Sequence, residues 1–327
     1  MSKTALLARL KDLAGQVDRA MQEDLGTIAS PRLLEVVRHA IFQGGKRIRP
    51  LLTYTAARLI NESPPQDTWQ LAMTFEYLHA ASLLHDDVID GSDFRRGKET
   101  ANRIWGITPV ILAGDYLHAR AMTIAGLVGG PECLAIIGAA TAAMVEAEFL
   151  QLQTAQENND DEANYFEVLR GKTAALIAAA CETGILHGGG NQSQREALRT
   201  YGTNLGLAFQ IIDDLLDYLG DPGKTGKAVG NDFSEGKMTL PLIHALNHCS
   251  RIDRQFLLAL LMAEPAERKK DLEKAAAVIA RAKGFDYARG RAENLIEEAC
   301  QGLLIFPENQ ARELLFGLAG YVLARDK

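Results

Sequence analysis

Apolar residues recur at helical spacing along nearly all of the chain, which has 327 residues. After Ser30 and Pro31, a favourable N-cap and a favourable first helical residue, apolar side chains mark one helix face as far as Gly44-Gly45. The same spacing predicts further helices near residues 51–61, 67–91, 108–127, 132–156, 161–187, 194–218 and 237–248, and several between 252 and 326. Because no linker or change of composition divides the chain, we predict an all-α fold in a single domain, residues 1–327.

Composition supports the helical interpretation and limits the classes of binding partner. Hydrophobic residues make up 47% of the chain and aromatic residues only 6%, which favours helices over strands. The formal net charge is −7, acidic and basic residues are mixed, and no basic stripe is present, so we expect no nucleic-acid partner.

The cysteines and the apolar runs predict the compartment. The four cysteines are far apart and form no CxxC pair, which is typical of reduced thiols in a cytoplasmic protein. Residues 1–20 have the pattern of an amphipathic helix rather than of a signal peptide. The apolar run Leu134–Val145 is too short to span a bilayer, so we expect a soluble protein without an integral membrane segment.

The pattern Asp-Asp-x-x-Asp occurs twice, each time within an apolar predicted helix. One copy consists of Asp86, Asp87 and Asp90, and the other of Asp213, Asp214 and Asp217. Residues i and i+4 share a helix face, so each copy should project three carboxylates into one sector. Unpartnered carboxylates in apolar surroundings are costly, which favours divalent cations over an ordinary acidic surface. Mg²⁺ suits such a site because water and phosphate oxygens complete its coordination, and two facing clusters would hold a diphosphate.

Basic residues beside helix breaks and glycines complement these carboxylates. They are Lys46, Arg47 and Arg49, then Arg95 and Arg96 after the first motif, and later Lys172 with Thr173, Lys224, Lys227 and Lys237. Arg offers a planar fork for phosphate oxygens and Lys a point charge. None of the Gly-Lys pairs has the earlier Gly that a P-loop requires, so we exclude a P-loop NTPase.

The histidines are weaker candidates for site residues than the aspartates and the basic residues. His79 lies seven residues before Asp86, on nearly the same face of the predicted helix. His244 and His248 have the i, i+4 spacing of zinc ligands, but no clear further ligand accompanies them, and a surface helix is the favoured interpretation.

The candidate residues favour one kind of chemistry. No Ser-His-Asp or Cys-His pairing and no dinucleotide-binding fingerprint is apparent. Carboxylates with Mg²⁺ and surrounding cations can instead stabilise a diphosphate that departs from carbon. An apolar cavity would protect the resulting carbocation from water.

On these motifs the chain resembles the trans-polyprenyl diphosphate synthases, and within them the long-chain, octaprenyl-type enzymes of bacteria. The matching segments are GGKRIRP (44–50), LLHDDVID with the following RRG, GDYL (114–117), GKTAAL (171–176), FQIIDDLLDY, residues 226–246 and the closing residues 324–327. The resemblance implies a large helical bundle of the isoprenoid synthase type, usually a homodimer.

The resemblance also implies a role for each matching residue. Isopentenyl diphosphate would be held by Lys46, Arg49, His79 and Arg96. The allylic diphosphate would be held by Arg95, Lys172, Thr173, Gln210, Lys227 and Lys237. The six aspartates would bind about two or three Mg²⁺ ions per active site, and Lys172, Lys227, Asp86, Asp87, Asp90, Asp213 and Asp214 would form the catalytic set. The released pyrophosphate would take the proton that ends each cycle.

Side-chain size predicts a long product. Ala81 and Ser82 lie one turn before Asp86, beside the expected path of the growing tail, where short-chain relatives have a bulky aromatic residue. By resemblance the deeper floor lies near Ala125 and Ile137. We predict octaprenyl diphosphate made from farnesyl diphosphate, passed to membrane enzymes for a quinone side chain. Close helix packing is the alternative reason for the small residues.

Three other functions are considered. A class I terpene cyclase usually replaces the second aspartate motif, and a non-catalytic prenyl-binding subunit usually lacks the aspartates and arginines that are present here. The catalytic subunit of a heteromeric long-chain synthase stays open.

Overall fold

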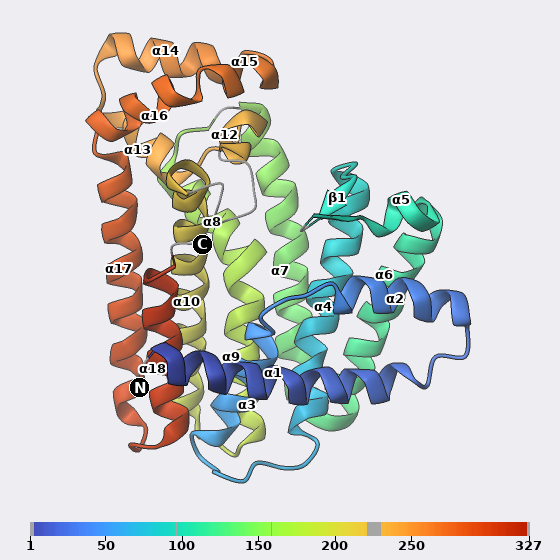
Figure 1. Cartoon of the computed structure of the whole chain (residues 1–327). Coiled ribbons are helices and arrows are strands. Elements are labelled where there is room, and N and C mark those ends of the chain that lie inside the picture. The colour runs from blue at the N-terminus through green and yellow to red at the C-terminus, as the bar shows by residue number, and fades with distance from the viewer. Residues whose placement is uncertain (1–2, 96, 158, 221–229, 326–327) are drawn as a thin grey trace. The chain divides into compact units, whose positions relative to one another are not determined.

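A computed structural model describes residues 3–95, 97–157, 159–220 and 230–325. Helices form nearly all of these ranges, which confirms the predicted all-α fold (Figure 1). The first half contains α1 (Lys3–Leu25), α2 (Pro31–Phe42), α3 (Ile48–Arg58), α4 (Thr68–Ile89), the strands β1 (Phe94–Arg95) and β2 (Lys98–Glu99), α5 (Ala101–Trp105), α6 (Ile107–Ile124), the π-helix η1 (Ala125–Gly129), α7 (Gly130–Glu157) and α8 (Glu162–Leu169). The second half contains the π-helix η2 (Arg170–Ala174), α9 (Ala175–His187), α10 (Gln192–Leu219), α12 (Asn231–Glu235), α13 (Leu240–His248), α14 (Arg251–Leu261), α15 (Pro265–Lys270), α16 (Leu272–Arg281), α17 (Gly284–Gly302), the 3₁₀-helix η3 (Leu303–Ile305) and α18 (Gln310–Leu323).

These elements group into two compact units. The first unit is Met1–Thr141, Leu176–Gly202 and Gly302–Leu318, and the second is Ala142–Ala175, Thr203–Gln301 and Ala319–Lys327. The first aspartate motif belongs to the first unit and the second motif to the second unit. The single domain of residues 1–327 stays a prediction.

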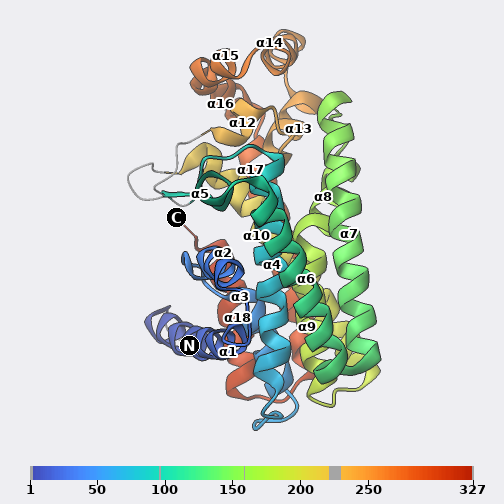
Figure 2. The ribbon, with the colours of Figure 1, turned by 90° about the vertical axis from the view of Figure 1, so that its right-hand side faces the viewer.

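Helix α4 forms the core of the first unit. Its side chains are apolar on nearly every face, and those of Phe75 and Tyr77 are completely buried. The helix packs on α3 and α6, and Figure 2 shows α6 running alongside it. It begins where the sequence predicts, but Asp67 does not cap it, because the Asp67 carboxylate lies 3.1 Å from Nε2 of His187.

The turn after α2 has the predicted boundaries. The Ser30 hydroxyl accepts the backbone N–H of Leu33 at 3.4 Å, and Pro31 opens the helix. Gly44 and Gly45 follow its end with φ of +96° and +142°, a backbone region that residues with a Cβ rarely adopt. The glycines therefore allow the chain to change direction after α2, before the basic residues that precede α3.

The second unit has its own apolar core. Tyr218 at the end of α10 packs with Phe233 of α12, and with buried side chains of α13, α14 and α16. Helix α10 matches the predicted 194–218 closely. Helix α13, predicted from 237, begins at Leu240, because Pro241 fits the first turn of a helix but not its interior.

The helix predicted over 161–187 is interrupted by η2. Gly171 lies in this π-helical turn, and a Cβ there would come within 2.4 Å of the Ala147 Cβ and 2.6 Å of the Ala143 carbonyl oxygen. Glycine thus permits close contact with the part of α7 in the second unit. Single π turns within helices often mark functional sites, and this one contains Lys172 and Thr173.

One segment of the described ranges, Ile107–Thr154, is apolar and long enough for a membrane span by length and composition. It contains the run Leu134–Val145, which by itself is too short to span a bilayer. Gly130, with φ of +78°, separates α6 and η1 from α7 within this segment. Only 22% of its most apolar window is buried, and in the first unit Leu127 is 82% exposed. Such a segment is weak evidence for a span, because helices of soluble proteins meet the same criterion.

Candidate active site

The first aspartate motif occupies the C-terminal turn of α4. Asp87 is buried, Asp86 is partly buried, and Asp90 is the exposed C-cap residue. The β1–β2 hairpin follows at once and places the Arg95 Nε 2.8 Å from Oδ1 of Asp87. An arginine therefore balances the charge of the buried carboxylate.

The GDYL segment supports the residue beside this motif. A Cβ on Gly114 would lie 2.3 Å from Nε2 of His85, so only glycine lets α6 come this close to α4. The His85 Nε2 atom lies 3.3 Å from the Ile111 carbonyl oxygen and 3.6 Å from the Asp115 carboxylate. The GDYL segment thus fixes the position of the His85 side chain, next to Asp86 in the sequence.

The residues expected to hold isopentenyl diphosphate also belong to the first unit. Lys46 is exposed in the loop before α3, and His79 is partly buried on α4. The Arg49 Nε is buried and has no hydrogen-bond partner among the described residues. Burial lowers the pKa of Arg49, although the Glu76 carboxylate acts in the opposite direction. A phosphate oxygen would satisfy this costly unpaired N–H. Arg96 lies outside the described residues.

The chain-length candidates are all in the first unit. Ala81, Ala125 and Ile137 are buried, and Ala125 opens the π-helix η1. Ser82 is partly buried, and its hydroxyl donates to the His79 carbonyl oxygen at 2.9 Å. A pocket beside the aspartate motif is lined by other side chains, among them His39, Ala80, Leu83, Leu84, Asp87 and Arg95.

The second aspartate motif lies in the last turns of α10, in a different chemical environment. Asp214 is buried, and its carboxylate accepts the Tyr165 hydroxyl at 2.7 Å and the Gln210 amide at 3.0 Å. Burial, followed by the nearby Asp232 carboxylate, raises the pKa of Asp214 to about 7. Burial and the Asp214 charge also raise the pKa of Tyr165, so its hydroxyl remains a neutral donor. Within the described ranges, Asp214 is therefore held by dipoles rather than by a cation.

Asp217 is engaged by the backbone. Its carboxylate oxygens accept the N–H groups of Asn231 at 3.2 Å and of Asp232 at 2.9 Å. Burial, followed by the Asp232 charge, raises the pKa of Asp217 to about 6. This aspartate thereby anchors the start of α12 in addition to any role at a metal.

Asp213 pairs with a residue that the sequence analysis did not assign. The Arg325 Nη2 donates to its Oδ1 at 3.1 Å, and the guanidinium lies 4.3 Å from the centre of the Phe209 ring. Within the part of the chain that the structure describes, the buried Nε and Nη1 of Arg325 find no acceptor. The closing residues 324–327 resemble those of the family, and that resemblance was the only sequence signal for Arg325.

The candidates for the allylic diphosphate divide between the units. Arg95 is in the first unit, whereas Lys172, Thr173, Gln210 and Lys237 are in the second, and Lys227 lies outside the described residues. Lys172 bonds Glu148 at 2.7 Å and Gln151 at 3.2 Å, and the Thr173 hydroxyl donates to Gln210 at 3.2 Å.

Lys237 lies beside two carboxylates. Its Nζ is 2.6 Å from Asp232 and 3.3 Å from Glu235. Burial alone would lower the pKa of Lys237, but these two neighbours raise it above its ordinary value. The side chain therefore keeps its positive charge.

The carboxylates fit Mg²⁺ in chemistry and in position. Both motifs end a helix, where the negative end of the helix dipole disfavours carboxylates and favours a cation. Residues 3–95, 97–157, 159–220 and 230–325 contain no ready-made group of three metal-ligating side chains. Mg²⁺ requires only one or two protein carboxylates per ion, because water and phosphate oxygens complete its coordination, so each motif has enough carboxylates to hold an ion.

Comparison with known proteins identifies the family. The sequence profile of the family described as polyprenyl synthetase matches residues 30–279. The octaprenyl diphosphate synthase of Escherichia coli (strain K12) is 36% identical over 319 residues, 97% of each chain.

Solved structures agree with this match. A polyprenyl synthase from Caulobacter crescentus CB15, complexed with calcium and isoprenyl diphosphate, is 37% identical, with a TM-score of 0.88 over 98% of both chains. A decaprenyl diphosphate synthase from Rhodobacter capsulatus is 38% identical, with a TM-score of 0.90 over 99% of both chains. Because the profile and these relatives cover most of the chain, it belongs to the polyprenyl synthetase family and is a prenyltransferase, a trans-prenyl diphosphate synthase.

Proposed function

We propose that this enzyme joins isopentenyl diphosphate head to tail to an allylic diphosphate, starting from farnesyl diphosphate, and releases octaprenyl diphosphate for a quinone side chain. The observation that carries the product is the similarity to the Escherichia coli octaprenyl diphosphate synthase over nearly the full chain. The decaprenyl diphosphate synthase of Rhodobacter capsulatus has a similar sequence identity to this chain, 38%, although its product has a different length. Product length therefore depends on individual side chains.

The proposed mechanism assigns each substrate to its own set of basic and polar residues. Arg95, Lys172, Thr173, Gln210, Lys227 and Lys237 hold the allylic diphosphate, and Lys46, Arg49, His79 and Arg96 hold isopentenyl diphosphate. Charge-assisted bonds from the first set stabilise the leaving diphosphate as its bond to carbon breaks. The released pyrophosphate accepts the proton that ends the cycle.

The aspartates complete the proposed site. Asp86, Asp87, Asp90, Asp213, Asp214 and Asp217 hold about two or three Mg²⁺ ions, which supply charge neutralisation for the diphosphate when bound. The Caulobacter crescentus relative, solved with calcium and isoprenyl diphosphate, supports a divalent ion beside this kind of substrate. Arg95, Tyr165 and Gln210 orient the buried carboxylates through the bonds described above.

Small side chains support a long product. Ala81 and Ser82 follow each other on α4 within the first unit, and Ala125 opens η1. We propose that the tail passes Ala81 and Ser82 and stops near Ala125 and Ile137. A phenyl ring at position 81 cannot be absorbed by a close-packed wall without strain.

Product analysis tests this function. The purified chain is incubated with Mg²⁺, labelled isopentenyl diphosphate and farnesyl diphosphate, and dephosphorylated products are separated by chromatography. We expect octaprenol from the wild type, and roughly three or four isoprene units from Ala81→Phe. Ile89→Phe, on the same helix but 65% exposed, is the control and should leave the product unchanged. No labelled product from the wild type would refute the synthase activity, and a decaprenyl product would refute the chain length alone.

The quaternary state and location are part of the proposal. We propose a cytoplasmic homodimer, with both units in one catalytic domain, that delivers its product to membrane enzymes. In the first unit, Ile107, Leu112 and Leu127 are each more than half exposed, and burying such apolar side chains favours association. Analytical ultracentrifugation should show a dimer that Leu112→Glu weakens. Ile252→Glu on α14, also at a highly exposed position, should leave the dimer intact.

A further inference from the structure

Arg47 has an unusual backbone conformation in the loop between α2 and α3. Its φ of +52° and ψ of +33° lie in the left-handed region. Apart from glycines, Arg47 and Lys283 are the positions with positive φ in the described ranges. A side chain disfavours this conformation by about 1–2 kcal/mol, so surrounding contacts must maintain it.

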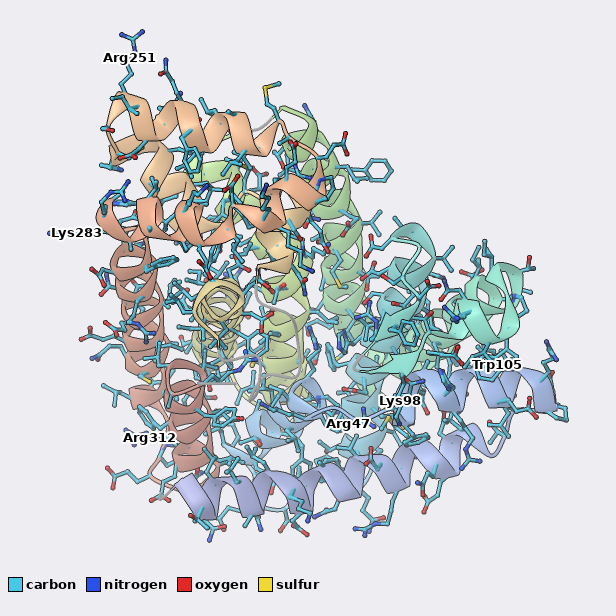
Figure 3. The ribbon with its side chains drawn as sticks, turned by 45° about the horizontal axis from the view of Figure 1, so that its top comes forward. Arg47, Lys98, Trp105, Arg251, Lys283 and Arg312 are labelled. Carbon is cyan, nitrogen blue, oxygen red and sulfur yellow. The ribbon has the colours of Figure 1, made fainter. Side chains whose placement is uncertain are left out.

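The Arg47 side chain supplies those contacts. It is only 5% exposed, and its Nε donates to Oδ1 of Asp18 at 2.8 Å. Nη1 donates to Oε1 of Glu76 at 2.6 Å, and Nη2 to the Ile41 carbonyl oxygen at 2.8 Å. These acceptors belong to α1, α4 and α2, all in the first unit, so three helices hold one guanidinium. Figure 3 labels Arg47 among the side chains.

The network is charged and largely buried. Burial opposes the charge of Arg47, but the carboxylates of Glu76 and Asp18 more than compensate, and the pKa of Arg47 rises. Glu76 is itself only 7% exposed. Removal of one partner from such a pair leaves an uncompensated charge, so the conformation of the loop depends on the whole network.

The left-handed turn sets the course of the neighbouring basic residues. The Arg47 carbonyl oxygen accepts the Leu51 N–H at 3.1 Å, which places Arg49 in the first turn of α3. Lys46 precedes the turn and is exposed. Every nitrogen of the Arg47 guanidinium already bonds a protein acceptor, whereas the Arg49 Nε is buried and finds no partner within the described residues.

We propose that Arg47 is a positioning residue for the isopentenyl diphosphate site. The Asp18–Arg47–Glu76 network fixes the left-handed turn that directs Lys46 and Arg49 toward the diphosphate. Asp18 is therefore linked to substrate affinity although it lies on α1, far along the chain from the basic residues. This inference rests on the proposed function, because it requires Lys46 and Arg49 to bind that substrate.

Binding of isopentenyl diphosphate alone tests the inference without turnover. Isothermal titration is performed on the full chain and on Arg47→Lys, which keeps the charge but cannot reach three acceptors. We expect Kd to rise by about tenfold, equivalent to the loss of one charge-assisted contact. Asp18→Ala should raise Kd about threefold, since one of the three bonds is lost. Arg58→Lys at the end of α3 is the matched control. The Arg58 guanidinium donates to the Glu62 carbonyl oxygen, and the Kd of this variant should not change.

Steady-state kinetics separates positioning from general destabilisation. In Arg47→Lys and Asp18→Ala, KM for isopentenyl diphosphate should rise while KM for farnesyl diphosphate stays within about twofold of wild type. Equal rises in the KM values for both substrates, or a Kd that is unchanged in both variants, would overturn the inference. The proposed function would stand in that case if the wild type has synthase activity. If the wild type binds no isopentenyl diphosphate, both the inference and the proposed function fail. Should Arg47→Lys lose its helical circular dichroism, Asp18→Ala decides the question.

Discussion

The two aspartate motifs share a sequence pattern and a position at the end of a helix, yet their surroundings differ. In the first unit, Asp87 is paired with the Arg95 guanidinium at 2.8 Å. In the second unit, the corresponding Asp214 is held by the Tyr165 hydroxyl and the Gln210 amide, both neutral. Its neighbour Asp213 has the cation, Arg325.

This difference determines how much charge each motif carries before metal binds. The guanidinium compensates the buried Asp87, whereas hydrogen bonds compensate Asp214 only in part, and burial and Asp232 raise its pKa to about 7. Carboxylates must be ionised to bind a metal. Asp87 is therefore preorganised by a cation, and Asp214 gains more from one.

Removal of an accessible carboxylate should have the largest effect on either motif. We expect Asp86→Ala and Asp213→Ala each to lower turnover by several orders of magnitude, because each removes a metal ligand rather than a packing group. The helical circular dichroism should be unchanged. Steady-state rates with Mg²⁺ measure the loss, and Asp12→Ala on the exposed side of α1 serves as the control. Near-normal activity of either variant would remove that motif from the metal site.

Two basic residues, one from each unit, should differ in the substrate that they affect. Arg49→Ala should raise KM for isopentenyl diphosphate, and Lys172→Ala should raise KM for the allylic diphosphate or slow its ionisation. Each loses a charge-assisted contact of about 1.5–3 kcal/mol, which corresponds to roughly 10- to 150-fold. Variation of one substrate at a time measures both constants. Equal effects on both substrates in both variants would contradict the division.

The sequence predicted long helices well and local interruptions poorly. Helix α10 extends over Gln192–Leu219, as its periodic pattern indicates, because one face packs along its whole length. The π turn at Arg170–Ala174 was missed, since it depends on the contact of Gly171 with Ala143 and Ala147, a tertiary contact. The β1–β2 hairpin and α5 were missed because elements of two to five residues have no measurable period.

In the candidate site, too, the sequence predicted local patterns well and long-range contacts poorly. Both aspartate motifs and the adjacent cations were evident, because each is a short pattern within one segment. Their partners were not evident: Tyr165 and Arg325 are 49 and 112 residues from the aspartates that they contact. No local pattern reports such pairs, since folding alone brings them together. The sequence predicted that each motif projects three carboxylates into one sector. It gave no sign that protein groups bond four of them, Asp87, Asp213, Asp214 and Asp217.

The smallest predicted effect concerns the pH dependence of stability in the second unit. The pKa of Asp214 is about 7 in the folded chain, against 3.8 as its ordinary value. As pH rises from about 4, the unfolded chain loses this proton first, so stability falls until about pH 7 and the penalty is then complete. Asp217, with a pKa raised to about 6, contributes in the same direction over a narrower range.

Asp214→Asn should remove the larger part of this dependence. Melting temperatures in EDTA should be most similar for wild type and variant near pH 4, below which the carboxyl is neutral in both the folded and the unfolded chain. At pH 8 the variant should melt a few degrees higher, because it never has to bury a charge beside Asp232. Asp90→Asn, at an exposed carboxylate of the first motif, is measured beside it as the control. If the difference in melting temperature between Asp214→Asn and wild type stays constant from pH 5 to 8, the Asp214 carboxylate is ionised throughout, and the expected effect of its burial beside Asp232 is wrong.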